Sequence, residues 1–163
     1  MNDKLMKNYL ESVLVTGSKI DSLDYIHLGI IEESGEIAGK VKKFYRGDYD
    51  QNTLRDNIKK EIGDLTWYLV LYGYKNGTLQ SGFRSAKSHS LPHNIKSLEI
   101  LKGRLAVAKT PRHKGVVINT MINTVTDLAN NFGLTMEEIC QTNIAKIKDR
   151  LLRNVLKGSG DER

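Results

Sequence analysis

Apolar residues recur at steps of three and four along most of this chain, the spacing that places them on one face of an α-helix. The clearest stripe runs through Ile58, Ile62, Leu65, Leu69 and Tyr72. Alternating apolar and polar runs, which would indicate half-buried strands, do not occur. The spacing therefore predicts an all-α bundle of roughly four to five main helices, at about residues 22–45, 54–75, 94–109, 116–132 and 136–153. A short helix near residues 3–14 is expected before them.

Capping and breaking residues mark where the expected helices begin and end. Gly133 stands where a helix commonly ends. Thr135 and Glu138 have the spacing of a capping box, which predicts that the last helix begins there. Pro111 is expected to end the helix at residues 94–109, because proline cannot continue a helix.

The length of 163 residues suits one domain, which would span residues 1–163. The single cysteine, Cys140, excludes a disulfide within the chain and is typical of a reducing compartment, so a cytoplasmic location is expected. No apolar run approaches the roughly 18 residues of a membrane span, and no membrane partner is expected.

Positive charge is concentrated in one stretch of the sequence. The whole chain carries 25 Lys plus Arg against 19 Asp plus Glu, a formal net charge of +6, which by itself favours binding to nucleic acid or a membrane surface. Residues 75–115 hold nine of the basic residues and one acidic residue, Glu99, which leaves 16 basic and 18 acidic residues elsewhere. The basic character therefore belongs to residues 75–115, and the remaining chain is slightly acidic.

Acidic residues gather at two places inside the expected helices. Glu33 and Glu36 are separated by about 60° around a helix, with Glu32 beside them, and Glu61 and Asp64 repeat the three-residue spacing. Like charges one turn apart destabilise an isolated helix by roughly a few tenths of a kcal/mol for each pair. Two such helices packed side by side would offer several carboxylates to hard cations such as Mg²⁺, which prefers oxygen ligands.

Acidic pairs at this spacing also occur in helical proteins without a magnesium site. Acidic side chains can simply decorate solvated helix faces, and a ferritin-like di-iron site also uses carboxylates from a bundle. The di-iron motif requires a histidine three residues after a glutamate, and this chain has no such pair. Gly35 and Gly63 stand inside the two acidic segments, where each costs roughly 1 kcal/mol of helix stability. They are expected to allow close helix approach beside the acids.

The acidic pairs and their surroundings resemble the MazG-like all-α nucleoside triphosphate pyrophosphohydrolases. The segments that carry the resemblance are residues 28–38, 60–69, 133–150 and 156–163. They lie within about residues 20–72 and 120–163. Compact members of the family lack an equivalent of about residues 75–115, so this basic stretch is interpreted as an insert made of a loop and a helix. The insert would cap the site, extend an interface between subunits, or bind nucleic acid.

The resemblance implies hydrolysis of an NTP or dNTP between the α and β phosphates, which yields the monophosphate and pyrophosphate and serves nucleotide-pool control or house-cleaning. It implies that Mg²⁺, or Mn²⁺ as a substitute, is held by Glu33, Glu36, Glu61 and Asp64. Glu32 would complete the metal shell or orient the attacking water. A homodimer or homotetramer is expected to complete the site.

Basic and amide side chains near the acids are the candidate substrate-binding residues. Lys40 and Lys43 follow the first acidic pair on the same helix face and are expected to reach phosphate or the metal site. Lys40 could instead pair with the glutamate one turn before it. The resemblance implies that Asn143 and Lys146 contact the nucleotide. Arg150 shares their helix face and would either bind a phosphate or pair with a neighbouring carboxylate.

Several alternatives stay open from the sequence alone. Trp67 and Tyr68 follow the second acidic pair and would either stack on a base or pack in the core. The tail at residues 156–163 would close over the site through Lys157 and Arg163. The substrate could also be an alarmone such as (p)ppGpp or a modified nucleotide. In a different class, the chain could be a basic helical nucleic-acid-binding protein without enzymatic activity.

Overall fold

The computed structural model describes residues 2–85 and 89–153, and six helices account for most of them. The helices are α1 (Asn2–Gly17), α2 (Leu23–Arg46), α3 (Gln51–Lys75), α4 (Leu91–Val107), α5 (Pro111–Asn131) and α6 (Met136–Leu152). No strand occurs within these ranges, so the prediction of an all-α protein is confirmed. None of the described helices is both long and apolar enough to cross a membrane. The tail residues Lys157 and Arg163 lie outside the described residues.

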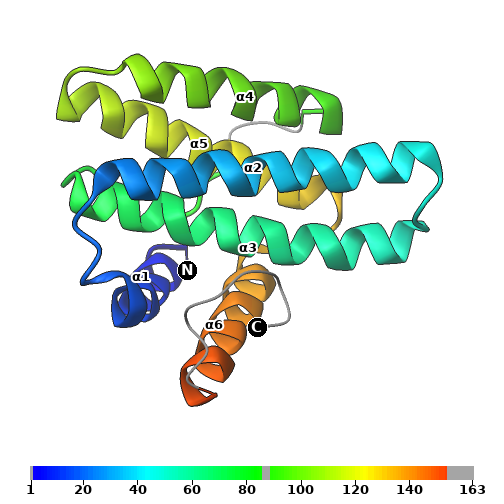
Figure 1. Ribbon diagram of the computed structural model, residues 1–163, viewed down its shortest axis with the longest axis horizontal. Coiled ribbons are helices and arrows are strands. Elements are labelled where there is room, and N and C mark those ends of the chain that lie inside the picture. The colour runs from blue at the N-terminus through cyan, green and yellow to red at the C-terminus, as the bar shows by residue number, and fades with distance from the viewer. Residues whose placement is uncertain (1, 86–88, 154–163) are drawn as a thin grey trace.

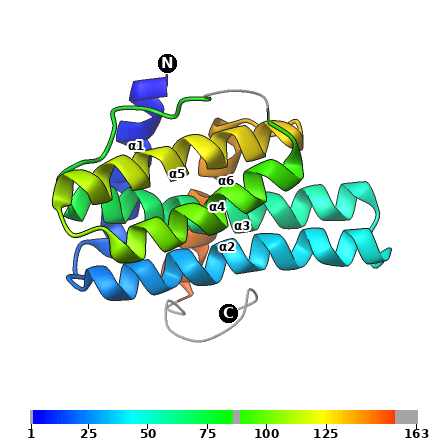
Figure 2. The ribbon, with the colours of Figure 1, turned by 90° about the horizontal axis from the view of Figure 1, so that it is seen from above.

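The two longest helices, α2 and α3, run antiparallel through the middle of the structure (Figure 1). Helices α4 and α5 pack along one side of this pair, and α1 and α6 lie on the other side (Figure 1). Figure 2 shows that α4 runs obliquely across the α2–α3 pair. Helix α3 contacts α1, α2, α5 and α6, and is therefore the element that joins the two sides.

The apolar stripe predicted for residues 54–75 lies in the core. Every member of that stripe on α3 is buried, as expected for a helix covered by four others. The core extends to α1, where Met6, Tyr9 and Val13 are buried at the spacing of one helix face. The helix expected near residues 3–14 is therefore a full member of the bundle, and it brings the number of described helices to six.

Prolines lie in the first turns of two helices. Pro92 lies in the first turn of α4, which begins three residues before the predicted start at residue 94. Pro111 is the first residue of α5, so the expectation that this helix begins near residue 116 was wrong. A proline in the first turn loses no helical hydrogen bond, because the amides there have no partner within the helix. The Thr110 hydroxyl caps α5 by accepting a hydrogen bond from the His113 amide (3.1 Å).

The connection between α3 and α4 is held against α5 by polar side chains. Asn119 of α5 accepts a hydrogen bond from the Gln80 amide (3.1 Å) and donates one to the Thr78 carbonyl (2.8 Å). One turn further along α5, Asn123 accepts a hydrogen bond from the Gln80 side chain (3.0 Å). The described part of residues 75–115 thus runs from the last residue of α3 through a loop held against α5 and through helix α4 to the first turn of α5.

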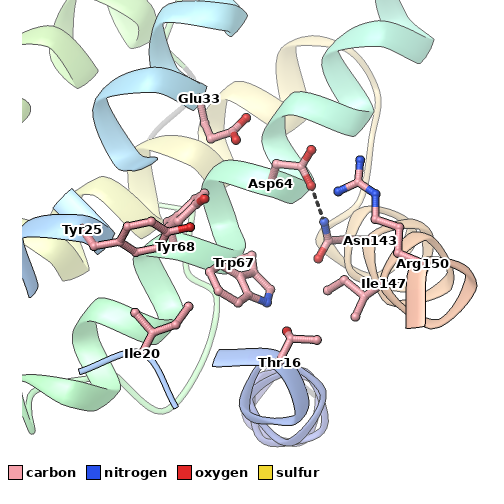
Figure 3. A pocket seen from close by; sticks show the side chains of 10 residues that line it. All are labelled: Thr16, Ile20, Tyr25, Glu33, Asp64, Trp67, Tyr68, Asn143, Ile147 and Arg150. Atoms are coloured by element: carbon pink, nitrogen blue, oxygen red, sulfur yellow. Dashed lines mark hydrogen bonds between the residues drawn. The ribbon is translucent and has the colours of Figure 1, made fainter. Parts of the chain in front are cut away.

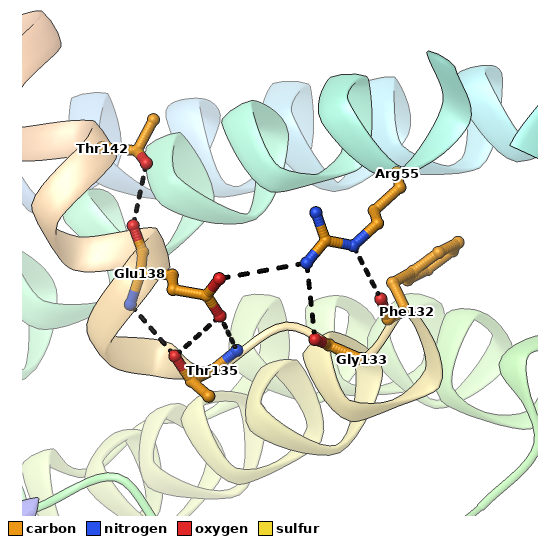
Figure 4. A network of polar contacts seen from close by, with 6 residues as sticks. All are labelled: Arg55, Phe132, Gly133, Thr135, Glu138 and Thr142. Carbon is orange, nitrogen blue, oxygen red and sulfur yellow. Dashed lines mark hydrogen bonds and ion pairs between the residues drawn. The ribbon is translucent and has the colours of Figure 1, made fainter. Parts of the chain in front are cut away.

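The turn between α5 and α6 is tied to α3 by Arg55 (Figure 4). The Arg55 guanidinium donates to the carbonyl oxygens of Phe132 (3.1 Å) and Gly133 (3.5 Å), and it lies 3.9 Å from the Glu138 carboxylate. The Glu138 carboxylate accepts a hydrogen bond from the Thr135 amide (2.8 Å), and the Glu138 amide donates to the Thr135 hydroxyl (3.2 Å). The predicted capping box is therefore confirmed. These contacts fix where α6 begins relative to α3.

We expect Thr135→Ala to lower the free energy of unfolding by about 1 kcal/mol, because an amide in the first turn of α6 loses its acceptor. Thr120→Ala is the matched control, since the exposed Thr120 hydroxyl only donates back to the Val116 carbonyl (2.7 Å). Its stability should stay within about 0.5 kcal/mol of wild type. Urea unfolding measures both values, and equal losses in the two variants would contradict a specific role for the cap.

Candidate metal centre

Three carboxylates from two helices converge near the middle of α2 and α3. Glu33 comes from α2, whereas Glu61 and Asp64 come from α3, one turn apart. Each offers an oxygen atom that lies within 4.8 Å of the others. Because α2 and α3 run antiparallel from a short connection, their two acidic segments meet at the same height of the bundle (Figure 1).

Two lysines partly balance the charge of this cluster. Glu61 is 1% exposed, and its Oε1 lies 3.1 Å from the ammonium group of Lys40. The ammonium group of Lys146 contacts Oδ2 of Asp64. A carboxylate removed from water is costly unless it is paired or hydrogen-bonded, so these contacts stabilise the cluster. Three ionised carboxylates against two ammonium groups still leave one negative charge in excess.

Burial and the excess negative charge both change the pKa of Glu33. Burial, together with the charges of Asp64, Glu36, Glu61 and Glu32, raises the pKa of the Glu33 carboxyl to about 8. Without a cation, Glu33 therefore favours its protonated form at neutral pH. A bound divalent cation would reverse this preference, because it favours the ionised carboxylate. The donor set thus fits a hard cation, both in its oxygen atoms and in its unbalanced charge.

The remaining candidates on α2 lie around this cluster. Glu32 and Glu36 are exposed, and neither is among the three carboxylates that meet within 4.8 Å. The expected role of Glu36 as a metal ligand, and that of Glu32 in the metal shell or in orienting the attacking water, therefore stay predictions. Lys43 is exposed near the end of α2, where its carbonyl accepts a hydrogen bond from the Asp48 amide (3.1 Å). Its expected contact with phosphate likewise stays a prediction.

Helix α6 brings its polar face to the cluster. Asn143 is buried, and its Nδ2 donates to Oδ1 of Asp64 (2.8 Å), while Lys146 contacts the other oxygen of Asp64. Arg150 lines a pocket beside them, with its guanidinium directed towards Asp64 (Figure 3). A Cβ atom at position 63 would lie 3.1 Å from the Asn143 Cβ, so Gly63 allows the close helix approach that the sequence predicted.

Tyr9 of α1 adds to this arrangement and was not identified from the sequence. Its buried hydroxyl oxygen lies 2.8 Å from Oδ1 of Asn143 and 3.2 Å from the Gly63 carbonyl oxygen. Burial raises the pKa of Tyr9 well above its usual value, so the hydroxyl keeps its proton and acts as a donor. A tyrosine within an apolar helix stripe indicates a buried hydroxyl that needs a hydrogen-bond partner. The helical spacing does not identify that partner.

A cavity of about 200 Å³ opens beside Asp64 (Figure 3). Tyr25, Trp67 and Tyr68 form its aromatic side, and the rings of Trp67 and Tyr68 meet edge to face with centroids 4.9 Å apart. The other lining residues are Thr16, Ile20, Glu33, Asp64, Asn143, Ile147 and Arg150. Trp67 and Tyr68 are thus half-buried side chains that both border the core and line the pocket.

The described part of the basic stretch at residues 75–115 lies away from the pocket beside Asp64. None of the described residues between 75 and 115 lines this pocket, which is formed by α1, α2, α3, α6 and the connection between α1 and α2. Helix α4 packs on α5 and α2 (Figures 1 and 2). Of the three roles expected for this stretch, capping the site has no support among the described residues.

Comparisons with known proteins place the chain near one phage protein. No protein-family model matches the chain, and no solved structure matches it. The chain is 26% identical over 147 residues to the "Gene 37 protein" of Mycobacterium phage L5, a similarity that covers 88% of this chain and 79% of that protein. That name states no activity, so the functional argument rests on the site itself.

Two glycines of α2 lead to opposite expectations. A Cβ atom at Gly29 would lie 2.3 Å from the Tyr68 ring, so Gly29→Ala should displace the ring and cost about 1–3 kcal/mol. A Cβ atom at Gly35 would meet no atom within 4 Å, contrary to the expected close approach of a helix there. Gly35→Ala should therefore stabilise the protein by up to about 1 kcal/mol.

Urea unfolding measures both effects, and the fluorescence of Trp67, the single tryptophan, reports the displacement of Tyr68. A destabilised Gly35→Ala variant would mean that a second subunit or another segment covers this face of α2.

The metal-free protein should lose stability as the pH rises from about 5 to 8. The Glu33 carboxyl has a pKa of about 8 in the folded chain against an ordinary value of 4.5, so the folded state binds the extra proton in this range. Stability falls with pH wherever the folded state binds more protons than the unfolded state. Glu33→Gln removes this loss and should exceed wild type at pH 8.5 by roughly 1 kcal/mol, allowing for partial exposure of the carboxyl.

Thermal unfolding in EDTA at pH 5, 7 and 8.5 measures the effect. Parallel pH profiles of wild type and Glu33→Gln would contradict the raised pKa. Added Mg²⁺ should stabilise wild type more at pH 8.5 than at pH 5, because only the ionised carboxylate binds it well.

Proposed function

We propose that this chain is a Mg²⁺-dependent nucleoside triphosphate pyrophosphohydrolase, which cleaves an NTP or dNTP between the α and β phosphates. The observation that carries the proposal is the convergence of Glu33, Glu61 and Asp64 beside a pocket that holds an arginine and an aromatic wall. The resemblance of the surrounding sequence segments to the MazG-like family supports the same activity.

Glu33, Glu61 and Asp64 would hold the cation, and their oxygen atoms suit Mg²⁺, with Mn²⁺ as a substitute. When bound, such an ion supplies charge neutralisation at the phosphates and a more acidic water. The chain itself fixes the geometry of the donors, since Asn143 and Lys146 each contact one oxygen of Asp64. Phosphoryl chemistry asks little covalent work of the protein, so positioning and electrostatics of this kind govern the rate.

The pocket supplies groups for both ends of a nucleotide. Arg150 lines the pocket and would bind phosphate oxygens through its guanidinium. Lys146, whose ammonium group contacts Asp64, would serve the same end of the nucleotide. Trp67 and Tyr68 offer ring faces and edges for a base at the other end. Stacking accepts any base, so this geometry serves (p)ppGpp or a modified nucleotide as well as an ordinary triphosphate.

A homodimer or homotetramer is also part of the proposal. Tyr25, Leu28 and Ile31 of α2 are 52%, 65% and 43% exposed, and their spacing puts them on one helix face next to the pocket. A second copy packed on this face would bury apolar surface and enclose the pocket, which Tyr25 lines. Light scattering from the purified chain measures the assembly directly.

The enzymatic proposal is tested on a panel of NTPs, dNTPs and ppGpp, with and without Mg²⁺. We expect release of pyrophosphate that depends on Mg²⁺, detected by a coupled pyrophosphate assay. Glu33→Gln and Asp64→Asn should each lower kcat/KM by about 100-fold or more, because each removes a charged oxygen ligand. Glu11→Gln, an exposed carboxylate on α1 outside the cluster, is the matched control and should keep the wild-type rate.

Two results would overturn the proposal in different ways. Unchanged turnover in both cluster variants would contradict the metal assignment. No turnover with any nucleotide, together with DNA binding that weakens steeply with salt, would favour a nucleic-acid-binding protein acting through the basic stretch at residues 75–115.

A further inference from the structure

Tyr9 lies behind the carboxylate cluster, separated from Asp64 by Asn143. Its side chain is 0% exposed, so its hydroxyl must be satisfied inside the protein. The hydroxyl oxygen lies 2.8 Å from Oδ1 of Asn143 and 3.2 Å from the Gly63 carbonyl oxygen. A phenol has one proton to donate, so the shorter distance makes the Asn143 amide oxygen its main acceptor.

This hydrogen bond and the Asp64 carboxylate favour the same orientation of the Asn143 amide. With Oδ1 turned to Tyr9, the amide nitrogen points at Asp64 and donates to its Oδ1 (2.8 Å). In the reversed orientation, the amide oxygen would face a carboxylate oxygen, and two acceptors would meet without a proton between them. Asn143 is 3% exposed, which leaves little water to relieve such a contact. The observed orientation is the one that satisfies all three side chains.

Asp64 is consequently held at both of its oxygen atoms. Asn143 donates to Oδ1 and Lys146 contacts Oδ2, both from α6. A carboxylate bonded at each oxygen keeps one orientation, which here directs it towards Glu33 and Glu61. Tyr9 itself does not line the pocket, and its hydroxyl reaches the cluster through Asn143 and, at the longer distance, through the Gly63 carbonyl.

We infer that Tyr9 is a positioning residue for the metal centre: acting through Asn143, it orients the Asp64 carboxylate for cation binding. The inference rests on the proposed function to the extent that the three carboxylates bind a divalent cation. Side chains that orient metal ligands from behind typically change metal affinity about 10- to 100-fold. Helix α1 thereby contributes to the site through Tyr9, which would contact neither the cation nor the substrate.

Tyr9→Phe tests this inference, because it removes the hydroxyl and keeps the ring against Phe83 (centroids 6.4 Å apart). We expect calorimetry on chelator-treated protein to give about tenfold weaker binding of Mg²⁺ and Mn²⁺. We also expect kcat to fall while the KM for the nucleotide changes little. Val13→Ala, also 0% exposed and on the same helix, is the matched control. It should lower the unfolding temperature but bind the cations as wild type does.

A double-mutant cycle with Asn143→Ala tests the route of the effect. In the Asn143→Ala background, Tyr9→Phe should weaken cation binding no further, and additive losses would overturn the inference. Wild-type cation affinity in Tyr9→Phe alone would overturn it as well. If Tyr9→Phe weakens cation binding but no nucleotide is hydrolysed, the proposed function fails and the inference stands. A wild-type chain that binds no divalent cation would overturn both.

Discussion

The approach of three carboxylates to within 4.8 Å is the physical constraint on which the rest of the site depends. Like charges at this distance, partly removed from water, cannot all ionise without compensation. Lys40 pairs with Glu61 and Lys146 pairs with Asp64. The third carboxyl, Glu33, has a raised pKa and favours its neutral form, so the remaining negative charge is avoided. Three carboxylates this close together lower the stability of the folded chain. They therefore fit a cation-binding site better than a structural role in the bundle.

Helix α6 contributes as much to the geometry of the site as α2 and α3, the helices that carry the carboxylates. Its start is tied to α3 by Arg55 and by the capping box, and its middle approaches α3 closely at Gly63. Together these contacts place Asn143 and Lys146 on Asp64, and Arg150 at the rim of the pocket. The site is therefore assembled from four helices, with α3 as the shared support.

The net positive charge of the protein comes from a stretch of sequence that does not include the carboxylate cluster. Residues 75–115 hold nine basic residues and one acidic residue, and their described part runs from the end of α3 through α4 to the first turn of α5. The carboxylate cluster opens instead towards α1 and α6, on the other side of the α2–α3 pair (Figure 1). A basic pI thus coexists with an acidic site, because none of the described residues between 75 and 115 lines the pocket.

The all-α class, the buried stripe of α3 and the capping box of α6 could be predicted from the sequence, because each follows from spacing along one helix. Spacing also singled out the acidic pairs, but the packing of α2 on α3 selected which carboxylates meet, and Glu36 is not among them. Two predictions failed for different reasons. Pro111 begins α5 as a first-turn proline, a local alternative to ending the preceding helix, whereas a Cβ atom at Gly35 would meet no atom within 4 Å because no neighbouring helix of the described part approaches there. Only the tertiary structure paired Lys40 with Glu61 and brought Tyr9 behind Asn143, 134 residues away. A helix period fixes the face on which a side chain lies, but its partner depends on how helices distant in sequence pack together.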